Sequence, residues 1–270
     1  MKKLIIHFIG SLLLFLFNSQ VLAFTIKLPE VQKEQFPGIL FNTLPKSGSI
    51  YITKRIAQGL NIKVIKMGVG YFPKDLIILP QIEELSFNGC FAQEHLDPSP
   101  MNLQILKKYL PKFIVHVRDP RQAILSLVHH FNTYKKLAPQ ILYRTFPVAT
   151  EKYFSLTLEK QIDWVIKNYF PAYIEWILGW IEAQEKGDLL IKFTTYEDFL
   201  ENEDAFYEKI LEFYNIPFSK FKKVNIPKDS SLHFRKGEKE EWRSVFTEKQ
   251  QQWVTAQMPE MLFDLFPWEP

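Results

Sequence analysis

Three segments of the chain combine cationic side chains with positions at which a phosphate group could bind. The first, residues 44–49 with the sequence LPKSGS, follows an apolar stretch and precedes a helical pattern. A strand, a turn and a helix start bring several backbone N–H groups together, and the first N–H groups of a helix lack partners within it. Lys46 adds a cation, and Ser47 and Ser49 add hydroxyl donors. The alternative is a helix capped by Ser47, with Lys46 in solvent.

The second segment follows the apolar stretch 113–117. Asp119 suits the N-cap of a helix and Pro120 suits its first turn. Arg118 therefore lies at the carboxyl end of a strand, where open α/β sheets bind ligands. Ser126 is two turns into the helix, so both side chains could reach one phosphate, the arginine through two parallel hydrogen bonds. The alternative is that Arg118 pairs with a carboxylate and Ser126 faces a neighbouring strand.

The third segment is the polar stretch 234–237, with the sequence FRKG. Its cations, Arg235 and Lys236, could close over an anion together with Gly237. Three glutamates follow within residues 238–241. The alternative is a solvated charge cluster, which is the usual outcome for such a run.

The remaining pattern predicts the elements that carry these segments. Short runs rich in Ile, Leu, Val or Phe predict buried strands over residues 38–43, 63–67, 76–79, 113–117 and 189–193. Longer patterns predict helices over residues 47–60, 120–134, 156–186 and 204–214, with Gly187 ending the third. Because strands and helices alternate, we expect an α/β protein with a parallel sheet covered on both faces. Residues 135–155 look irregular and could form a flap, and 222–241 indicate a loop.

The composition is that of a globular protein, with 47% hydrophobic and 23% charged residues. This excludes a disordered chain, a collagen and a multi-span membrane protein. The formal charge is +3, but Lys2 and Lys3 supply two of these charges. Without them the chain is close to neutral, so we do not expect a nucleic acid as partner. Cys90 is the one cysteine, which excludes an intrachain disulfide and a cysteine-rich metal site.

Residues 1–23 have the three-part layout of a secretory signal peptide. Two lysines lead, an apolar run covers residues 4–17, and small residues stand at the end. The run has 14 residues, fewer than the ~20 needed to span a bilayer as a helix. We therefore predict a signal peptide over 1–23, or an uncleaved anchor, followed by a single domain over 24–270. The protein would be exported or held in the secretory pathway, with membrane attachment only if the segment stays uncleaved.

Together, the three cationic segments resemble the sulfotransferases that use 3′-phosphoadenosine-5′-phosphosulfate (PAPS), and are most similar to their cytosolic-type branch. Residues 42–51, NTLPKSGSIY, resemble the family's phosphosulfate loop TxPKSGTxW. Residues 118–126, RDPRQAILS, resemble its 3′-phosphate segment, and 234–247, FRKGEKEEWRSVFT, resemble its motif RKGxxGxWKxxFT. The resemblance covers residues 38 to about 250. It implies a three-layer, P-loop-like α/β fold with a central parallel sheet flanked by helices.

The resemblance also implies roles for single residues. Lys46 would stabilise the leaving phosphate as charge develops on it. The residues implied for the 5′-phosphate are Ser47, Gly48 and Ser49. Those implied for the 3′-phosphate are Arg118, Ser126, Arg235, Lys236 and Gly237. Those implied for the adenine are Tyr51, which replaces the family's Trp, and Tyr196, which matches its adenine-contacting Tyr.

A general base is implied by residues 91–96, FAQEHL, which resemble the KTHL stretch of the cytosolic branch. His95 would remove the proton of the acceptor, because imidazole titrates near neutral pH. Glu94 is the alternative base, since other branches use a carboxylate. Gln93 replaces a lysine of the family, and Glu240 replaces a glycine. The adjacent His129 and His130 lack the spacing of metal ligands and are interpreted as structural.

The sequence therefore predicts a PAPS-dependent sulfotransferase that needs no metal. It would transfer a sulfuryl group by in-line displacement to a hydroxyl or amine of a small-molecule or glycan acceptor. One alternative is a catalytically silent, sulfotransferase-like nucleotide-binding protein, which Gln93 and Glu240 would favour. A second is an ATP-dependent phosphotransferase, but Lys46 precedes the single glycine of its loop, unlike the GxxxxGK[ST] pattern.

Overall fold

The computed structural model describes residues 36–145, 150–226 and 237–270. Residues 36–270 form one compact unit. The predicted signal peptide over 1–23 lies outside the described residues, as do Arg235 and Lys236. Cys90 is buried and is a free thiol, as expected for a chain with one cysteine.

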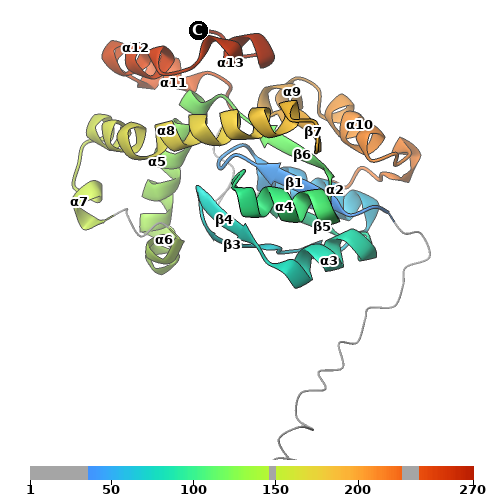
Figure 1. The fold of residues 1–270 in the computed structure, drawn as a ribbon. Coiled ribbons are helices and arrows are strands. Elements are labelled where there is room, and N and C mark those ends of the chain that lie inside the picture. Colours follow the sequence, from blue (N-terminus) through green and yellow to red (C-terminus); the bar gives the residue numbers. More distant parts are fainter. Residues whose placement is uncertain (1–35, 146–149, 227–236) are drawn as a thin grey trace, which may run out of the picture. The chain divides into compact units, whose positions relative to one another are not determined.

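A five-stranded parallel sheet forms the centre of this unit (Figure 1). Its order is β2 (Val64–Ile65), β5 (Phe91–Glu94), β1 (Ile39–Thr43), β6 (Lys112–Val117) and β7 (Leu190–Thr195). Every neighbouring pair is parallel, so the carboxyl ends of all five strands lie along one edge. Each residue of β1 is buried, as expected for a central strand covered on both faces.

Helices cover both faces of the sheet. Residues before 155 contribute α2 (Ser49–Leu60), α3 (Leu79–Asn88), α4 (Pro100–Tyr109), α5 (Pro120–Leu137), α6 (Pro139–Thr145) and α7 (Glu151–Phe154). The second half contributes α8 (Leu158–Glu185), α9 (Tyr196–Glu201), α10 (Glu203–Phe213), a 3₁₀ turn (Phe218–Lys220), α11 (Glu241–Val245), α12 (Glu248–Ala256) and α13 (Glu260–Leu265). The α/β class with a central parallel sheet flanked by helices is confirmed.

Alternate strand residues enter two different hydrophobic cores. Leu40 and Val115 pack with side chains of α5 and α8, while Phe41 and Ile114 pack with side chains of α2 and α10. This alternation follows from the two-residue period of a strand. The strands are buried on both faces, which explains their near-continuous apolar sequences.

The prediction of a buried strand over 76–79 is wrong. Leu76 belongs to β4 (Lys74–Ile77), which pairs in antiparallel fashion with β3 (Gly68–Tyr71) as a separate hairpin. Leu76 is 45% exposed, and Leu79 already begins α3. The strand that completes the main sheet is β5, whose short sequence FAQE mixes apolar and polar residues and predicted no strand.

The prediction of an irregular flap over 135–155 is wrong for the described part of that range. α5 continues to Leu137, and α6 and α7 follow. Leu142 and Tyr153 are buried, and the ring of Tyr153 lies edge-on to Phe131, 5.7 Å between centroids. These contacts attach the segment to α5. In the predicted loop 222–241, the described residues 222–226 and 237–240 contain neither helix nor strand.

The long helix predicted over 156–186 is confirmed as α8. It ends at Glu185, and Gly187 follows with φ 75°, a left-handed conformation that favours glycine. Among the described residues, no helix combines the length and the apolar character needed to cross a membrane.

Candidate functional site

The turn between β1 and α2 has an unusual backbone. Lys46 has φ 70° and Gly48 has φ 79°, so two residues of this turn adopt the left-handed conformation. The N-cap of α2 is Gly48, and the predicted helix start at residue 47 is two residues early. Ser47 does not cap the helix, because its hydroxyl donates back to the carbonyl oxygen of Leu44 at 2.7 Å.

Position 48 favours glycine for two reasons, the left-handed backbone and the close approach of the Tyr196 ring. A Cβ atom at this position would lie 2.6 Å from the ring of Tyr196. Tyr196 is the first residue of α9, directly after β7, and it is buried. The close approach places the start of α9, directly after β7, against the turn that precedes α2.

Arg118 contacts the first cationic segment and Glu238, the residue that follows the third. Its Nη1 donates to the carbonyl oxygen of Lys46 at 2.9 Å, and its Nη2 donates to that of Glu238 at 2.8 Å. Its guanidinium lies 4.1 Å from the ring centroid of Tyr196, a distance typical of a cation–π contact. Gly237, with φ 73°, directly precedes the carbonyl that Arg118 binds. The structure therefore brings together residues 46–48, Arg118, Tyr196 and 237–238.

The charges at this junction favour an anion. Burial and the neighbouring charge of Arg118 lower the pKa of Lys46 to about 7, and burial lowers the pKa of Arg118. Among the described residues, the buried Nε of Arg118 has no hydrogen-bond partner. Two adjacent cations and an unsatisfied buried donor lose free energy on desolvation, and an anion would recover it. This donor set fits the phosphate groups of a nucleotide.

His116 is a site residue that the sequence analysis missed. Its Nε2 lies 3.0 Å from the carbonyl oxygen of Ser47, and its Nδ1 lies 2.9 Å from the hydroxyl of Thr194. A carbonyl only accepts, so Nε2 carries the proton and Nδ1 accepts from Thr194. Burial lowers the pKa of His116 to about 3, which keeps the ring neutral. The only sequence signal was one polar residue within an otherwise apolar strand.

His95 follows β5 and contacts the end of β1. Its Nδ1 lies 2.6 Å from the carbonyl oxygen of Thr43, so Nδ1 donates and Nε2 keeps a lone pair. Burial lowers the pKa of His95 to about 4, against the opposing hydrogen bond to Thr43. The charges of Lys66 and Lys46 lower it further. The ring is therefore neutral at pH 7.

Glu94, the alternative base, is fully buried and points to the hairpin. Its Oε1 accepts from the backbone N–H of Met67 at 2.6 Å, and its Oε2 pairs with Lys66. The neighbouring Gln93 donates from Nε2 to the hydroxyl of Thr43 at 3.0 Å. The side chains of residues 93–95 therefore divide between β1 and the hairpin.

Tyr51 and Ser126 lie further along the helices. The ring of Tyr51 is half-buried, 5.9 Å from that of Phe199, which in turn lies 5.9 Å from Tyr196. This chain of rings links Tyr51 to the Arg118 junction. Ser126 is half-buried in α5, the helix that Arg118 precedes.

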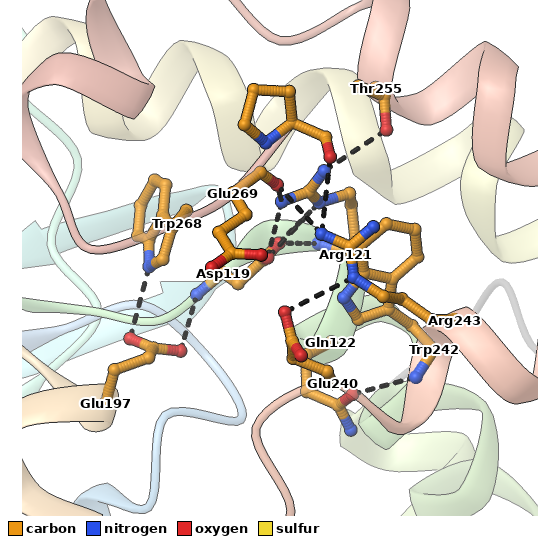
Figure 2. A network of polar contacts seen from close by, with 11 residues as sticks. Asp119, Arg121, Gln122, Glu197, Glu240, Trp242, Arg243, Thr255, Trp268 and Glu269 are labelled. Atoms are coloured by element: carbon orange, nitrogen blue, oxygen red, sulfur yellow. Dashed lines mark hydrogen bonds and ion pairs between the residues drawn. The ribbon is translucent and has the colours of Figure 1, made fainter. Parts of the chain in front are cut away.

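A polar network anchors the start of α5 next to Arg118 (Figure 2). Asp119 caps the helix, as the sequence predicted, and its Oδ2 pairs with the fully buried Arg121 at 2.8 Å. Glu197 accepts from the backbone N–H of Asp119 at 3.2 Å and from the indole of Trp268 at 3.1 Å. Asp119, which follows Arg118 in the chain, is thus anchored and pairs with Arg121, while the Nη atoms of Arg118 donate to the backbone carbonyls of Lys46 and Glu238.

Trp242 connects the third cationic segment to this network. Its backbone N–H donates to Oε1 of Gln122 at 3.0 Å, and Arg121 lies 4.2 Å from its ring centroid. Arg243 lies 4.5 Å from the same centroid, and its Nε donates to Glu240 at 3.2 Å (Figure 2). The carboxylate of Glu240 is therefore paired with a cation.

His129 and His130 lie half-buried in α5, and the ring of His130 is 4.3 Å from that of Tyr134. Within the described ranges, no three His, Cys, Asp or Glu side chains are grouped as metal ligands would be.

The fold and the junction around Arg118 define an α/β protein whose cationic side chains Lys46 and Arg118 lie at the carboxyl edge of the sheet, after β1 and β6. The family model of the sulfotransferase domain matches residues 37–263, and the chain belongs to this family.

Individual relatives are distant. The chain is 25% identical to sulfotransferase 6B1 of Danio rerio over 173 residues, which are 58% of this chain and 53% of that protein. The match thus spans about half the length of this curated relative. A crystal structure of mouse sulfotransferase SULT7A1 complexed with PAP aligns with a TM-score of 0.55 at 20% identity, over 82% of this chain and 81% of that chain. This likeness establishes the fold, a three-layer P-loop-like sheet.

A second solved structure, the sulfotransferase domain from the curacin biosynthetic pathway, aligns with a TM-score of 0.49 at 13% identity. It covers 84% of this chain and 100% of that one.

Proposed function

We propose that the protein transfers a sulfuryl group from PAPS to a hydroxyl or amine of a small-molecule or glycan acceptor. The observation that carries the proposal is the convergence of Lys46, Arg118 and Tyr196 in a member of the sulfotransferase family. The mouse relative of the same fold is complexed with PAP, the nucleotide that remains after sulfuryl transfer. Adjacent cations with an unsatisfied donor suit such a ligand.

Lys46, Arg118 and the turn that joins them would bind the nucleotide. Bound PAPS supplies a sulfuryl group on a phosphate that can leave. Lys46 would hold charge at the leaving oxygen, and its lowered pKa would rise again beside a phosphate, because an opposite charge favours the ammonium form. Ser47, Gly48 and Ser49 would donate at the start of α2, where the helix dipole is positive. Arg118 and Ser126, with Gly237 and the residues 235–236, would hold the 3′-phosphate.

His95 would act as the general base. Its Nδ1–H is committed to Thr43, so the lone pair of Nε2 is the basic position. A neutral imidazole can accept the proton of the acceptor at pH 7, whereas Glu94 is occupied by Met67 and Lys66. This difference favours His95 over Glu94. Proton transfer to a positioned side chain contributes about 10²–10⁴-fold to a rate.

The test uses radiolabelled PAPS and a panel of alcohols, phenols, amines and glycans. We expect a labelled product from the wild-type protein, and a loss of about 10²–10⁴-fold in kcat for His95→Ala. Binding of adenosine-3′,5′-bisphosphate should be retained in His95→Ala and weakened in Lys46→Ala. The proposal fails if both variants turn over like the wild type. Nucleotide binding without product would favour the catalytically silent alternative.

We also propose export, from the composition of residues 1–23 alone. PAPS is a cytosolic product, so an exported enzyme needs imported donor or retention in a secretory compartment. N-terminal sequencing of the protein purified from its own cells tests the proposal. A mature N-terminus near residue 24 supports a cleaved signal peptide, and an intact Met1 contradicts cleavage.

A further inference from the structure

Lys66 lies at the same edge of the sheet as the proposed catalytic residues. It follows β2 directly, and β2 pairs in parallel with β5 so that Ile65 lies opposite Ala92. Lys66 and Gln93 are therefore the next residues on two neighbouring strands. Gln93 is uncharged and stands two positions before His95. Lys66, opposite Gln93 on the neighbouring strand, is therefore a cation at the same position along the sheet.

The ammonium group of Lys66 is held by a contact that it can leave. It pairs with Oε2 of Glu94, but the Lys66 side chain is 66% exposed while that of Glu94 is buried. The exposed ammonium group can exchange this partner for another anion, such as the oxygens of a sulfuryl group. Glu94 keeps the 2.6 Å hydrogen bond from Met67 on Oε1 if Lys66 turns away. Its Oε2 then loses its charged partner, which is a cost that the new contact has to offset.

The charge of Lys66 already acts on the proposed base. Lys66 and Lys46 are the two cations that lower the pKa of His95. The other charged groups that face Lys66 are Glu94 and Asp75, from β5 and β4. Lys66 pairs with Glu94, the residue directly before His95, so its ammonium group lies next to the strand end that carries the proposed base.

We propose that Lys66 is a second cation for the sulfuryl group and contacts its oxygens during transfer. The inference rests on the proposed function. In the transfer, the bond from sulfur to the phosphate oxygen breaks and its electron pair stays on that oxygen. A new bond forms from sulfur to the acceptor, whose proton passes to Nε2 of His95. Lys66 makes no covalent bond and stabilises the charge on the sulfuryl oxygens, as Lys46 does on the leaving oxygen.

A binding experiment tests this without turnover. The affinities of the full chain for PAPS and for adenosine-3′,5′-bisphosphate, which lacks the sulfuryl group, are compared by calorimetry. In Lys66→Gln we expect PAPS to bind about 5-fold more weakly and the bisphosphate to bind as in the wild type. Lys66→Arg should keep the wild-type ratio. The matched control is Lys74→Gln, an 81% exposed lysine of the neighbouring β3–β4 hairpin that pairs with Asp97 at 3.3 Å, and it should change neither affinity.

Kinetics give a second readout. Lys66→Gln should lower kcat about 10- to 100-fold with the best acceptor of the panel. The double variant Lys66→Gln with Gln93→Lys moves the cation to the neighbouring strand and should recover most of the loss. Lys66→Gln should also move the acid limb of kcat/KM to higher pH, because His95 is easier to protonate once a nearby cation is gone.

The inference is overturned if Lys66→Gln keeps the wild-type ratio of the two affinities, or if Lys74→Gln changes it equally. If the wild type binds both nucleotides but yields no sulfated product, the proposed function fails while the affinity ratio still decides the role of Lys66. If the wild type binds neither nucleotide, both proposals fall.

Discussion

The two sides of the site are built from different interactions. The nucleotide side consists of residues 44–49, Arg118 and Tyr196, and its contacts are mostly hydrogen bonds to backbone carbonyls and ring contacts. The base side consists of residues 93–97, Lys66 and the β3–β4 hairpin, and it is held by ion pairs such as Lys66 with Glu94 and Lys74 with Asp97. Interactions with the backbone persist through side-chain changes elsewhere, whereas an ion pair requires both partners.

This difference suits the two ligands. A nucleotide offers the same phosphates and ring in every reaction cycle, and under the proposed function a backbone-built site with a neutral His116 would recognise them without change. An acceptor has to be matched by side chains, and the base side carries exposed lysine side chains that can reorient, such as Lys66 and Lys74. We therefore expect substitutions on the nucleotide side to affect folding or nucleotide binding, and those on the base side to affect turnover.

The largest expected effect is on stability, at Arg121 behind the nucleotide side. Arg121→Ala leaves Asp119 as an unpaired buried carboxylate, which should cost about 3–5 kcal/mol of unfolding free energy in urea denaturation. The matched control is Arg243→Ala, on the same Trp242 ring. Its side chain is 35% exposed and pairs with an exposed glutamate, so the loss should stay below about 1 kcal/mol. Equal losses in the two variants would contradict this account of the network.

The second effect is on nucleotide binding, at Gly48. Gly48→Ala adds a Cβ atom 2.6 Å from the Tyr196 ring in a left-handed residue. The left-handed strain alone is about 1–2 kcal/mol, so we expect adenosine-3′,5′-bisphosphate to bind at least about 10-fold more weakly. Gly187→Ala is the control, because Gly187 has φ 75° but no atom within 4 Å of its Cβ position. Gly187→Ala should lose some stability and keep wild-type nucleotide binding. Weaker binding in this control would show that a left-handed alanine far from the site is enough to reduce affinity, which would contradict a specific role of Gly48.

The same division describes what the sequence could predict. The strands β1, β6 and β7 are mostly apolar, and the segments after them carry the motifs, so the nucleotide side was predicted from local sequence together with the resemblance to the family. The short β5 was not, because its Gln93 and Glu94 bind Thr43 and Lys66 rather than enter an apolar core. Polar residues at the carboxyl edge of the sheet interrupt the apolar run by which a buried strand is recognised in the sequence.

Long-range contacts account for the other omissions. Glu197 and Trp268 are 71 residues apart in sequence and share one hydrogen bond. The buried Arg121 depends on Asp119 nearby and on Trp242 far along the chain. No periodicity or motif marks such pairs, because only the packed chain brings them within reach. The strand around Leu76 was expected in the main sheet for the same reason. Its pairing partner β3 and its exposure to solvent depend on the tertiary structure and are not marked in the local sequence.

The two sides should also respond to pH with opposite sign. On the nucleotide side, the pKa of His116 is lowered to about 3 by burial. Its contribution to stability is therefore complete above the ordinary histidine value of about 6.5 and is lost as pH falls below it. On the base side, burial raises the pKa of Asp75 to about 6, with Glu94 and Asp97 adding to the rise and Lys66 opposing it. That contribution is complete below the ordinary aspartate value and is lost as pH rises through about 6.

The smallest expected effect concerns the base side and tests the predicted loss of stability as pH rises. Asp75→Asn removes a buried carboxylate whose Oδ1 has no hydrogen-bond partner among the described residues. Relative to the wild type, the variant should gain stability as pH rises from 4 to 7, reaching about 1 kcal/mol in urea denaturation. Asp188→Asn is the control, because Asp188 is 57% exposed and pairs with Lys107 at the surface. If the difference in unfolding free energy between Asp75→Asn and the wild type does not change from pH 4 to 7, burial does not raise the pKa of Asp75. The contrast between the two sides would then depend on His116 alone.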